Sequence, residues 1–235
     1  EAQKILNHLK GITEDSKLEK LIELITEINQ RNKGTKILLY TKHPATLKYI
    51  SDTLKKQKFS ITEFKGGLTS DEKTNRIKEF KEKTQIMIST ETGSEGLNLQ
   101  FCSNIINYDL PWNPMAVEQR IGRLDRIGQN KNIFVYNLAT KGTMEEHVVD
   151  LIINKMCCIG LIMGELPIIL FNMGLDSNGR SGSSKFEEKI MTAFLSSKNN
   201  LNRFASEIDK VGNEINKGIK EYEQTKKYTS ELLDD

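Results

Sequence analysis

Three arginines stand three residues apart in one short stretch of the chain. The stretch is EQRIGRLDRIGQ, and it contains Arg120, Arg123 and Arg126. A guanidinium group keeps its charge at physiological pH and forms paired hydrogen bonds to phosphate oxygens. Residues spaced by three share one face of a helix. A solvated basic helix is the ordinary interpretation of such a run, and a phosphate-binding element is the alternative.

Two features of the same stretch favour a ligand. Gly122 and Gly128 stand where a helix prefers other residues, at a cost of about 1 kcal/mol each in a helix interior. Gln119 and Gln129 flank the arginines with neutral groups that both donate and accept hydrogen bonds. Glycines beside arginines allow another backbone or a phosphate to approach closely. We therefore expect the run to lie against another backbone or a phosphate.

A second polar stretch, STETGSEGLNLQ, follows an apolar segment. It mixes hydroxyl side chains with two glycines and an asparagine. The hydroxyls of Ser89, Thr90 and Thr92, with nearby backbone N–H groups, are suited to hold a phosphate. Gly93 and Gly96 alone are a weak signal, because any turn can require glycine.

The single tryptophan, Trp112, lies between Pro111 and Pro114. A lone tryptophan usually packs in a core. A loop made rigid by two prolines can instead hold an exposed ring against the sugar and base edges of a nucleic acid. Both interpretations remain open from the sequence.

The apolar pattern predicts helices that alternate with strands as far as residue 158. Strands are expected at residues 35–41, 59–67, 85–90, 103–111 and 131–139. Helices are expected at residues 16–34, 43–57, 68–83, 114–128 and 142–156, the first with Ser16 as its N-cap and Gly34 at its end. This alternation is typical of a parallel sheet covered by helices on both faces. Such sheets bind ligands at the carboxyl ends of their strands.

The C-terminal part has a different character. Residues 176–184 have the composition of a linker. Apolar residues then recur at threes and fours in a predicted helical region: Leu201, Phe204, Ile208, Val211, Ile215, Ile219 and Tyr222. Basic and acidic residues are nearly balanced there, so the region is not a basic nucleic-acid arm. It is expected to pack on the main domain, on another domain or on a second copy of the chain. A short coiled coil is one arrangement in which it could do so.

Bulk composition excludes several classes of protein. A net charge of +2 is too small to indicate nucleic-acid binding by itself. The three cysteines and three histidines show no metal-ligand spacing, which predicts no metal site and a reducing, cytoplasmic setting. Residues 156–175 are apolar, but Glu165 and Pro167 lie at their centre. A buried helical segment is therefore expected, and not a membrane span.

Several blocks, in this order, resemble a known family. They are KILLYTK, FKGGLTSDEKTNRIKEF, ISTETGSEGLNLQFCSNIINYDLPWNP and EQRIGRLDRIGQ. They are similar to the second RecA-like lobe of superfamily-two helicases, above all to Swi/Snf-type ATPases and the bacterial branch related to the RNA-polymerase-associated ATPase. The resemblance covers about residues 15 to 158. It implies an α/β, RecA-like parallel sheet of the P-loop NTPase type with helices on both faces. We expect this lobe at residues 1–175, a linker at 176–184 and a helical extension at 185–235.

The resemblance also implies roles for individual residues. Arg123 and Arg126 match the arginine fingers that reach the γ-phosphate of ATP. Gly96, Asn98 and Gln119 match positions that line the nucleotide site or couple that site to DNA. Positions near the phosphates and sugar edges of the tracked DNA strand are matched by Thr41, Lys42, Gly66, Thr90 and Trp112. Arg120 is the least certain of the three arginines and is expected to serve the fold.

One departure from the full motor limits the interpretation. The sequence has no G-x-x-x-x-G-K-[ST] loop and no acidic metal-binding box of the D-E-x-H type. In the family, ATP and Mg²⁺ are held mainly by an N-terminal RecA-like lobe of the same protein. Because the first residue is Glu1 and not methionine, we expect that lobe upstream, and we expect the fragment alone to be inactive.

The whole protein is then expected to be an ATP-dependent double-stranded-DNA translocase. RNA polymerase, or another DNA-bound complex, is a candidate partner, and no membrane is. A restriction-modification motor carries the same lobe and is an alternative context. The alternative from another class is a non-catalytic nucleic-acid-binding or interaction module derived from such a lobe.

Overall fold

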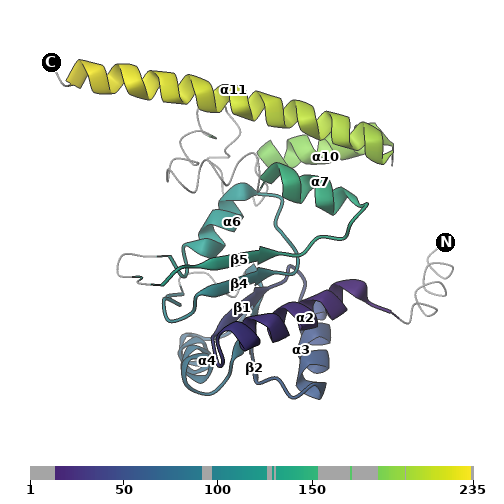
Figure 1. Ribbon diagram of the computed structural model, residues 1–235, viewed down its shortest axis with the longest axis vertical. Helices are drawn as coiled ribbons and strands as arrows, with labels where there is room; N and C mark the ends of the chain where they lie inside the picture. The colour runs from purple at the N-terminus through teal and green to yellow at the C-terminus, as the bar shows by residue number, and fades with distance from the viewer. Residues whose placement is uncertain are drawn as a thin grey trace. The chain divides into compact units, whose positions relative to one another are not determined.

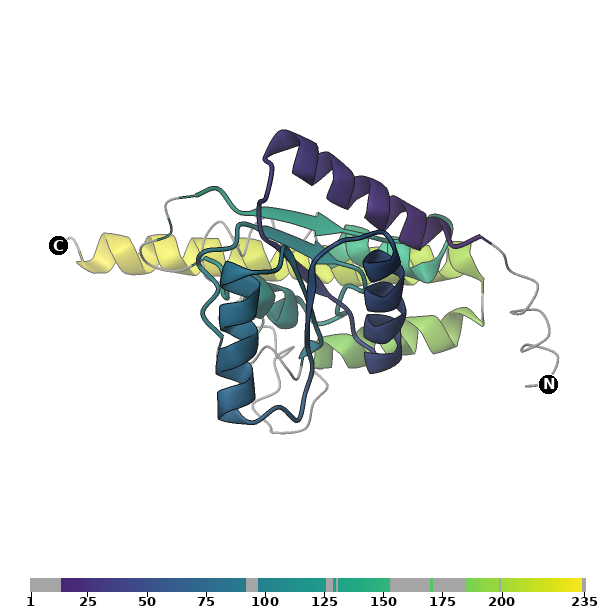
Figure 2. The same ribbon diagram turned by 90° about the horizontal axis from the view of Figure 1, so that it is seen from below.

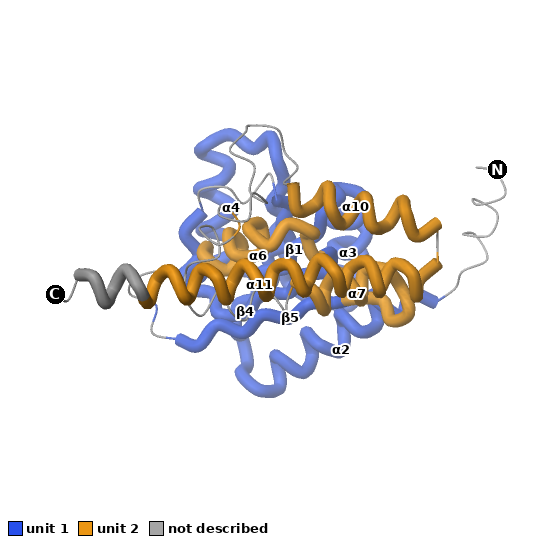
Figure 3. The backbone as a smooth tube through the Cα atoms, turned by 90° about the horizontal axis from the view of Figure 1, so that it is seen from above, with its two compact units in different colours: residues 1–109, 124–138 blue, residues 110–123, 139–235 orange. Residues whose placement is uncertain are grey.

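The structure is a computed structural model of the 235-residue chain. It describes residues 14–91, 97–125, 129, 131–152, 170, 185–198 and 200–233. The chain divides into two compact units (Figure 3). Unit 1 comprises residues 1–109 and 124–138, and unit 2 comprises residues 110–123 and 139–235. Each unit is described by itself.

Unit 1 is built on a parallel five-stranded sheet in the order β2-β3-β1-β4-β5 (Figure 1). The strands are β1 (Ile37–Tyr40), β2 (Ile61–Phe64), β3 (Ile86–Ser89), β4 (Asn104–Asn107) and β5 (Phe134–Asn137). Each lies inside a segment that the apolar pattern predicts, so the predicted parallel sheet is confirmed. Residues of β1, β3 and β4 are all buried, as expected for strands covered on both sides.

Helices α2 (Ser16–Arg31) and α3 (Pro44–Lys56) pack on one face of this sheet (Figure 2). Their apolar side chains share a core with alternate residues of the strands, such as Leu39 of β1 and Ile88 of β3. Helix α4 (Ser70–Glu82) covers the other face, because the ring of its Phe80 lies 5.9 Å from the ammonium of Lys36. Lys36 and its neighbour Ile37 point to opposite faces, as successive strand residues do.

The ends of helix α2 differ from those predicted. The predicted N-cap Ser16 is wrong: Ser16 is the first helical residue, and Asp15 caps α2 by accepting a hydrogen bond from the Leu18 amide at 2.9 Å. A carboxylate fulfils this role as well as a hydroxyl does, so the two adjacent residues are not separable by type. The helix ends at Arg31, before the predicted Gly34. Thr69 and Glu72 form a capping box at the start of α4.

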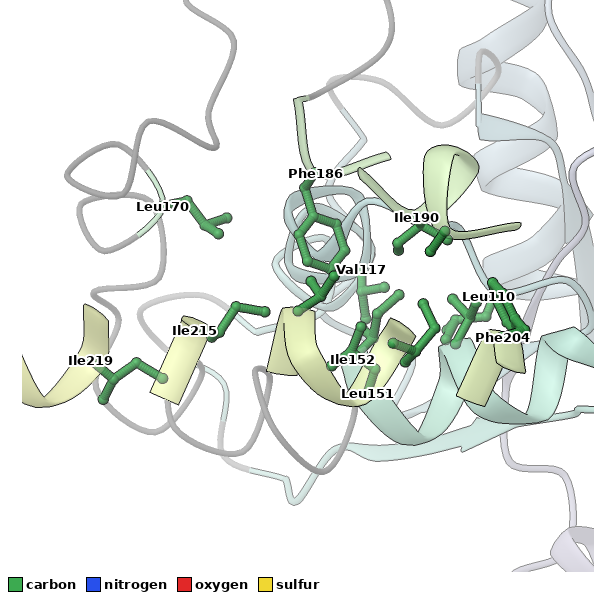
Figure 4. Packing of buried hydrophobic residues seen from close by; sticks show 14 residues of the cluster. Leu110, Val117, Leu151, Ile152, Leu170, Phe186, Ile190, Phe204, Ile215 and Ile219 are labelled. Carbon is green, nitrogen blue, oxygen red and sulfur yellow. The ribbon is translucent and has the colours of Figure 1, made fainter. Parts of the chain in front are cut away.

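Unit 2 is helical. Its helices are α6 (Pro114–Ile121), α7 (Met144–Asp150), α10 (Lys185–Ser197) and α11 (Leu201–Leu233). Figure 4 shows that apolar side chains from these helices converge, among them Val117, Ile152, Phe186 and Phe204. The predicted helical extension is confirmed, and its apolar stripe packs on other helices of its own unit.

Several predictions concern residues outside those described. They include the linker at residues 176–184, the domain boundary at 175, and the apolar segment 156–175 except for Leu170. Leu170 is buried in the apolar cluster of unit 2. Among the helices that the structure describes, none is long and apolar enough to cross a bilayer.

Candidate functional site

Four predicted site residues of unit 1 follow the carboxyl ends of strands at one edge of the sheet: Thr41, Lys42, Gly66 and Thr90. In the strand register, Tyr40 of β1 pairs with Ser89 of β3 and with Asn107 of β4. The backbone ladder then continues: the Thr41 amide donates to Ser89 at 3.1 Å, and the Thr90 amide donates to the carbonyl of Phe64 at 3.2 Å. The strands therefore end in register, and the residues that follow them lie side by side at this edge of the sheet.

The strand order identifies the place on this edge where a ligand is expected. From β1 the chain passes through α3 to β2 on one side, and from β4 it passes to β5 on the other side. Neighbouring strands β1 and β4 thus send their connections in opposite directions. Such a switch point opens a crevice at the carboxyl ends of the strands, where α/β sheets bind their ligands.

Asp109 lies at this switch point and links the segments that follow β1 and β4. Its Oδ2 accepts hydrogen bonds from the Thr41 hydroxyl at 2.6 Å and from the Lys42 amide at 3.1 Å. Its Oδ1 lies 3.9 Å from the ammonium of Lys17, which in turn lies 5.1 Å from the centre of the Tyr108 ring. The sequence did not single out Asp109 or Lys17. Asp109 falls near the end of the strand predicted at residues 103–111, and Lys17 falls at the start of the helix predicted at residues 16–34.

Solvent exposure divides the predicted DNA-side residues into two groups. Lys42 and Gly66 are exposed, whereas Thr41 is 0% and Thr90 is 3% exposed. A hydroxyl has one proton to donate, and that of Thr41 goes to Asp109. Of these four residues, Lys42 and Gly66 are therefore the ones that reach solvent. The turn after β2 needs a glycine at Gly67, whose φ is 85°.

The arginine run does not form one continuous helix. Helix α6 ends at Ile121, and Gly122 is its C-cap, with its amide donating to the carbonyl of Glu118 at 2.8 Å. The prediction of a helix at residues 114–128 is wrong for residues 122–125, because glycine is a poor helix former and Gly122 ends the helix, and residues 126–128 lie outside those described. Arg123 lies in the turn that follows. The shared helical face predicted for Arg120 and Arg123 is therefore also wrong.

The three arginines lie in different surroundings. Arg120 is 3% exposed, which agrees with the expectation that it serves the fold. Arg123 is half-buried, and its amide donates to the carbonyl of Arg120 at 3.3 Å. Arg126 and Gly128 lie outside the described residues, as does Gly96 of the second polar stretch.

Gln129 holds the far end of the arginine run through its side-chain amide. The Nε2 group donates to the carbonyls of Gln100 at 2.8 Å and Leu124 at 3.1 Å, and Oε1 accepts from the Lys131 amide at 3.1 Å. All of these partners belong to unit 1. The glutamine that the sequence marked as a neutral flank is thus a brace between backbone segments.

The remaining predicted residues are placed as follows. Gln119 is exposed on α6, and Asn98 is exposed with its Oδ1 accepting from the Gln100 amide at 3.3 Å. Trp112 is half-buried and packs against the apolar cluster of unit 2, so the ring contributes to a core. Beside Gln119, burial raises the pKa of the Glu118 carboxyl.

Two ordinary kinds of reactive centre are not formed by the part of the chain that the structure describes. No three His, Cys, Asp or Glu side chains there group as metal ligands. The described free thiol, Cys102, is buried, and that burial raises its pKa to about 12, so it stays protonated and unreactive. What the described site offers is cationic and hydrogen-bonding groups for an anion.

Comparison with known proteins places these features in context. The family model of the helicase conserved C-terminal domain matches residues 16–128. The chain is 35% identical over 208 residues to the uncharacterized ATP-dependent helicase YqhH of Bacillus subtilis, covering 84% of this chain and 36% of that protein. It is 36% identical over 135 residues to the RNA polymerase-associated protein RapA of Vibrio parahaemolyticus, covering 56% of this chain and 14% of that protein.

A solved structure agrees with these relatives. The chain matches the SWI2/SNF2 ATPase core of Sulfolobus solfataricus, solved in complex with double-stranded DNA, with a TM-score of 0.51 and 28% identity. The match covers 66% of this chain and 33% of that one. The predicted RecA-like fold is confirmed. The chain spans about a third of the Bacillus relative and of the Sulfolobus core.

Proposed function

We propose that the chain is the second motor lobe of an ATP-dependent double-stranded-DNA translocase, because its residues 16–128 match the helicase conserved C-terminal domain and it is similar to an ATP-dependent helicase and to a SWI2/SNF2 ATPase core. The observation that carries this proposal is the exposed Lys42 at the switch point of the sheet. An exposed ammonium beside backbone turns suits a phosphate chain, and the Sulfolobus relative was solved with double-stranded DNA.

In the proposed motor, Arg123 and Arg126 act as arginine fingers. Their guanidinium groups neutralise the negative charge that develops on the γ-phosphate as it is transferred. Gln119, exposed on α6, and Asn98 lie on the nucleotide side. ATP and Mg²⁺ would be held mainly by an N-terminal RecA-like lobe, and Mg-ATP supplies the reactive phosphate. The cationic, half-buried Arg123 fits the role of a partner for that phosphate.

The DNA side of the proposal assigns backbone contacts to this chain. Lys42 supplies a charge and Gly66 an accessible backbone, and Thr41, Thr90 and Trp112 lie near the tracked strand in the family pattern. Contacts to phosphates carry no sequence information, which suits a translocase that must move along any sequence. Binding of duplex DNA should therefore weaken as salt is added.

The arginine assignment is tested in the full-length protein by changing Arg126→Ala and Arg123→Ala separately. Each change should lower DNA-stimulated ATP hydrolysis by a factor of about 10³ while ATP still binds. Arg76→Ala is the matched control, because Arg76 is exposed on α4 and pairs with Glu79 at 3.0 Å. If both finger variants turn over ATP as fast as the control, the assignment is wrong.

A second candidate function is a nucleic-acid-binding or interaction module without catalysis. The full-length protein discriminates the two, because a module binds duplex DNA but shows no hydrolysis that DNA stimulates. Association with RNA polymerase is a further proposal, motivated by the similarity to the RNA polymerase-associated protein of Vibrio parahaemolyticus. Co-purification of the full-length protein with polymerase tests it.

A further inference from the structure

We infer that Asp109 is a positioning residue, which fixes Lys42 for its contact with the DNA backbone. The inference rests on the proposed function, since it takes Lys42 as a phosphate contact. It starts from one carboxylate oxygen that receives two donors from the same segment. Oδ2 of Asp109 accepts the Thr41 hydroxyl at 2.6 Å and the Lys42 amide at 3.1 Å.

These two bonds fix the residue from which the exposed ammonium extends. The backbone bond from the Tyr108 amide to the Tyr40 carbonyl, at 2.9 Å, already joins the ends of β4 and β1. Asp109 continues that connection by one further residue with its side chain. The Lys42 backbone is thereby held in place, while its side chain remains exposed. A cation on a fixed backbone loses less freedom when it binds a phosphate.

A carboxylate near a phosphate path needs its own charge balanced. Lys17, from the first turn of α2, lies 3.9 Å from the other oxygen of Asp109. Its side chain is only 17% exposed, so it is held against Asp109 and the Tyr108 ring more than it is presented to solvent. Lys17 offsets the charge of Asp109, and the carboxylate can position Lys42 without repelling DNA at full strength.

The contacts predict a pattern of coupling between residues. If Asp109 acts through Lys42, then losing Asp109 should matter only while Lys42 is present. If Asp109 merely braces two loops, its loss should weaken DNA binding by the same factor in either background. A double-mutant cycle separates these roles, because coupled residues depart from additivity.

The experiment uses the full-length protein and measures two quantities. One is the concentration of duplex DNA that gives half-maximal stimulation of ATP hydrolysis, and the other is the rate at saturating duplex. Lys42→Ala and Asp109→Ala should each raise the half-maximal concentration about tenfold, as expected for losing a charge-assisted contact. Together they should raise it by no more than about twofold beyond Lys42→Ala alone. The rate at saturating duplex should change less than the half-maximal concentration.

Two further variants guard against a folding defect in Asp109→Ala. Asp109→Asn retains an oxygen that accepts both donors and should stay within about threefold of the native protein. Thr41→Val removes one donor and should raise the half-maximal concentration by about threefold, but not in the Lys42→Ala background. Asp52→Ala is the matched control, since Asp52 is exposed on α3 and forms a surface ion pair with Lys48 at 3.2 Å.

The outcomes are distinguishable. Multiplying effects of Asp109→Ala and Lys42→Ala, about a hundredfold together, would overturn the positioning role and leave the DNA contact of Lys42 standing. The same holds if Asp109→Ala binds duplex like the Asp52→Ala control while Lys42→Ala does not. If Lys42→Ala itself has no effect on the half-maximal concentration, the proposed DNA edge fails, and the role of Asp109 fails with it.

Discussion

Gln129 offers a direct test of how the far end of the arginine run is held. Its side-chain amide makes three hydrogen bonds, to the Gln100 and Leu124 carbonyls and from the Lys131 amide. Gln129→Met keeps the length of the side chain and removes all of them. Each bond contributes about 1 kcal/mol net. Because Gln129 is only half-buried, water replaces part of the loss, and a total of about 2 kcal/mol is expected.

Amide hydrogen exchange measures that loss locally. A change of about 2 kcal/mol corresponds to exchange about 30-fold faster at the Lys131 amide, which donates to Gln129 in the native protein. The sheet amides, such as those of β1, should exchange as before. Gln57→Met is the matched control, because Gln57 is an exposed residue at the end of α3. Native protection at Lys131 in the Gln129→Met variant would refute the brace.

Two more predictions concern unit 2. Phe204→Ala should lower the free energy of unfolding of that unit by about 3–5 kcal/mol, because Phe204 is 1% exposed, whereas Leu195→Ala, at a residue 68% exposed, should cost less than about 0.5 kcal/mol. Limited proteolysis of α10 and α11 measures both, and equal cleavage of the two variants would contradict the core assignment.

Glu118→Gln should raise the melting temperature near neutral pH. Burial raises the folded-state pKa of this carboxyl above its ordinary value of 4.5, and Oε2 has no hydrogen-bond partner among the described residues. The contribution of Glu118 to stability is therefore fully present below its unfolded pKa and is lost as pH rises through the folded pKa. The advantage of the glutamine variant should shrink as pH falls towards 4.5, and an advantage independent of pH would contradict this account.

The sheet was predictable because its strands carry their signal locally. The run at residues 37–40 is apolar, and the run at residues 86–89 is apolar up to Ser89. A short apolar run between polar segments is what a strand buried on both faces looks like. The spacing of apolar residues in α11 is equally local, since one face of a helix is built from threes and fours. Helix ends were less predictable. Asp15 and Ser16 are both good caps, and only the backbone conformation decides between them.

The hydrogen bonds from Thr41 and Lys42 to Asp109 at the switch point were not predictable, for a different reason. Asp109 and Thr41 are 68 residues apart in the chain, and they meet because β4 lies beside β1. Alternation of helices and strands predicts a parallel sheet, but it does not contain the strand order. The rule that ligands bind at the carboxyl ends of strands therefore predicts the edge of the sheet, but it does not predict that the segments after β1 and β4 contact each other there. The sequence could name Thr41 and Lys42, but not the carboxylate that holds them.

The arginine run is divided in the structure, although its spacing predicts a single helix. The sequence predicts one helix that carries all three arginines. In the structure, the boundary between the two compact units falls inside it, between Arg123 and Leu124. The N-terminal part belongs to α6, which ends at Ile121 with Gly122 as its C-cap, and in the C-terminal part Gln129 is hydrogen-bonded to Leu124 and Lys131.

The two predicted fingers should therefore respond to different remote changes. Weakening the core around Phe204 acts on the helix that leads to Arg123, since α6 packs in that cluster. Gln129→Met acts instead on Leu124 and Lys131, to which the Gln129 side chain is hydrogen-bonded. In the full-length protein, Phe204→Ala should add little to a loss already caused by Arg123→Ala, and Gln129→Met should add little to one caused by Arg126→Ala. If the loss of ATP hydrolysis caused by each remote change multiplied equally with the loss caused by either finger variant, the two parts of the run would not respond separately, and this account would be wrong.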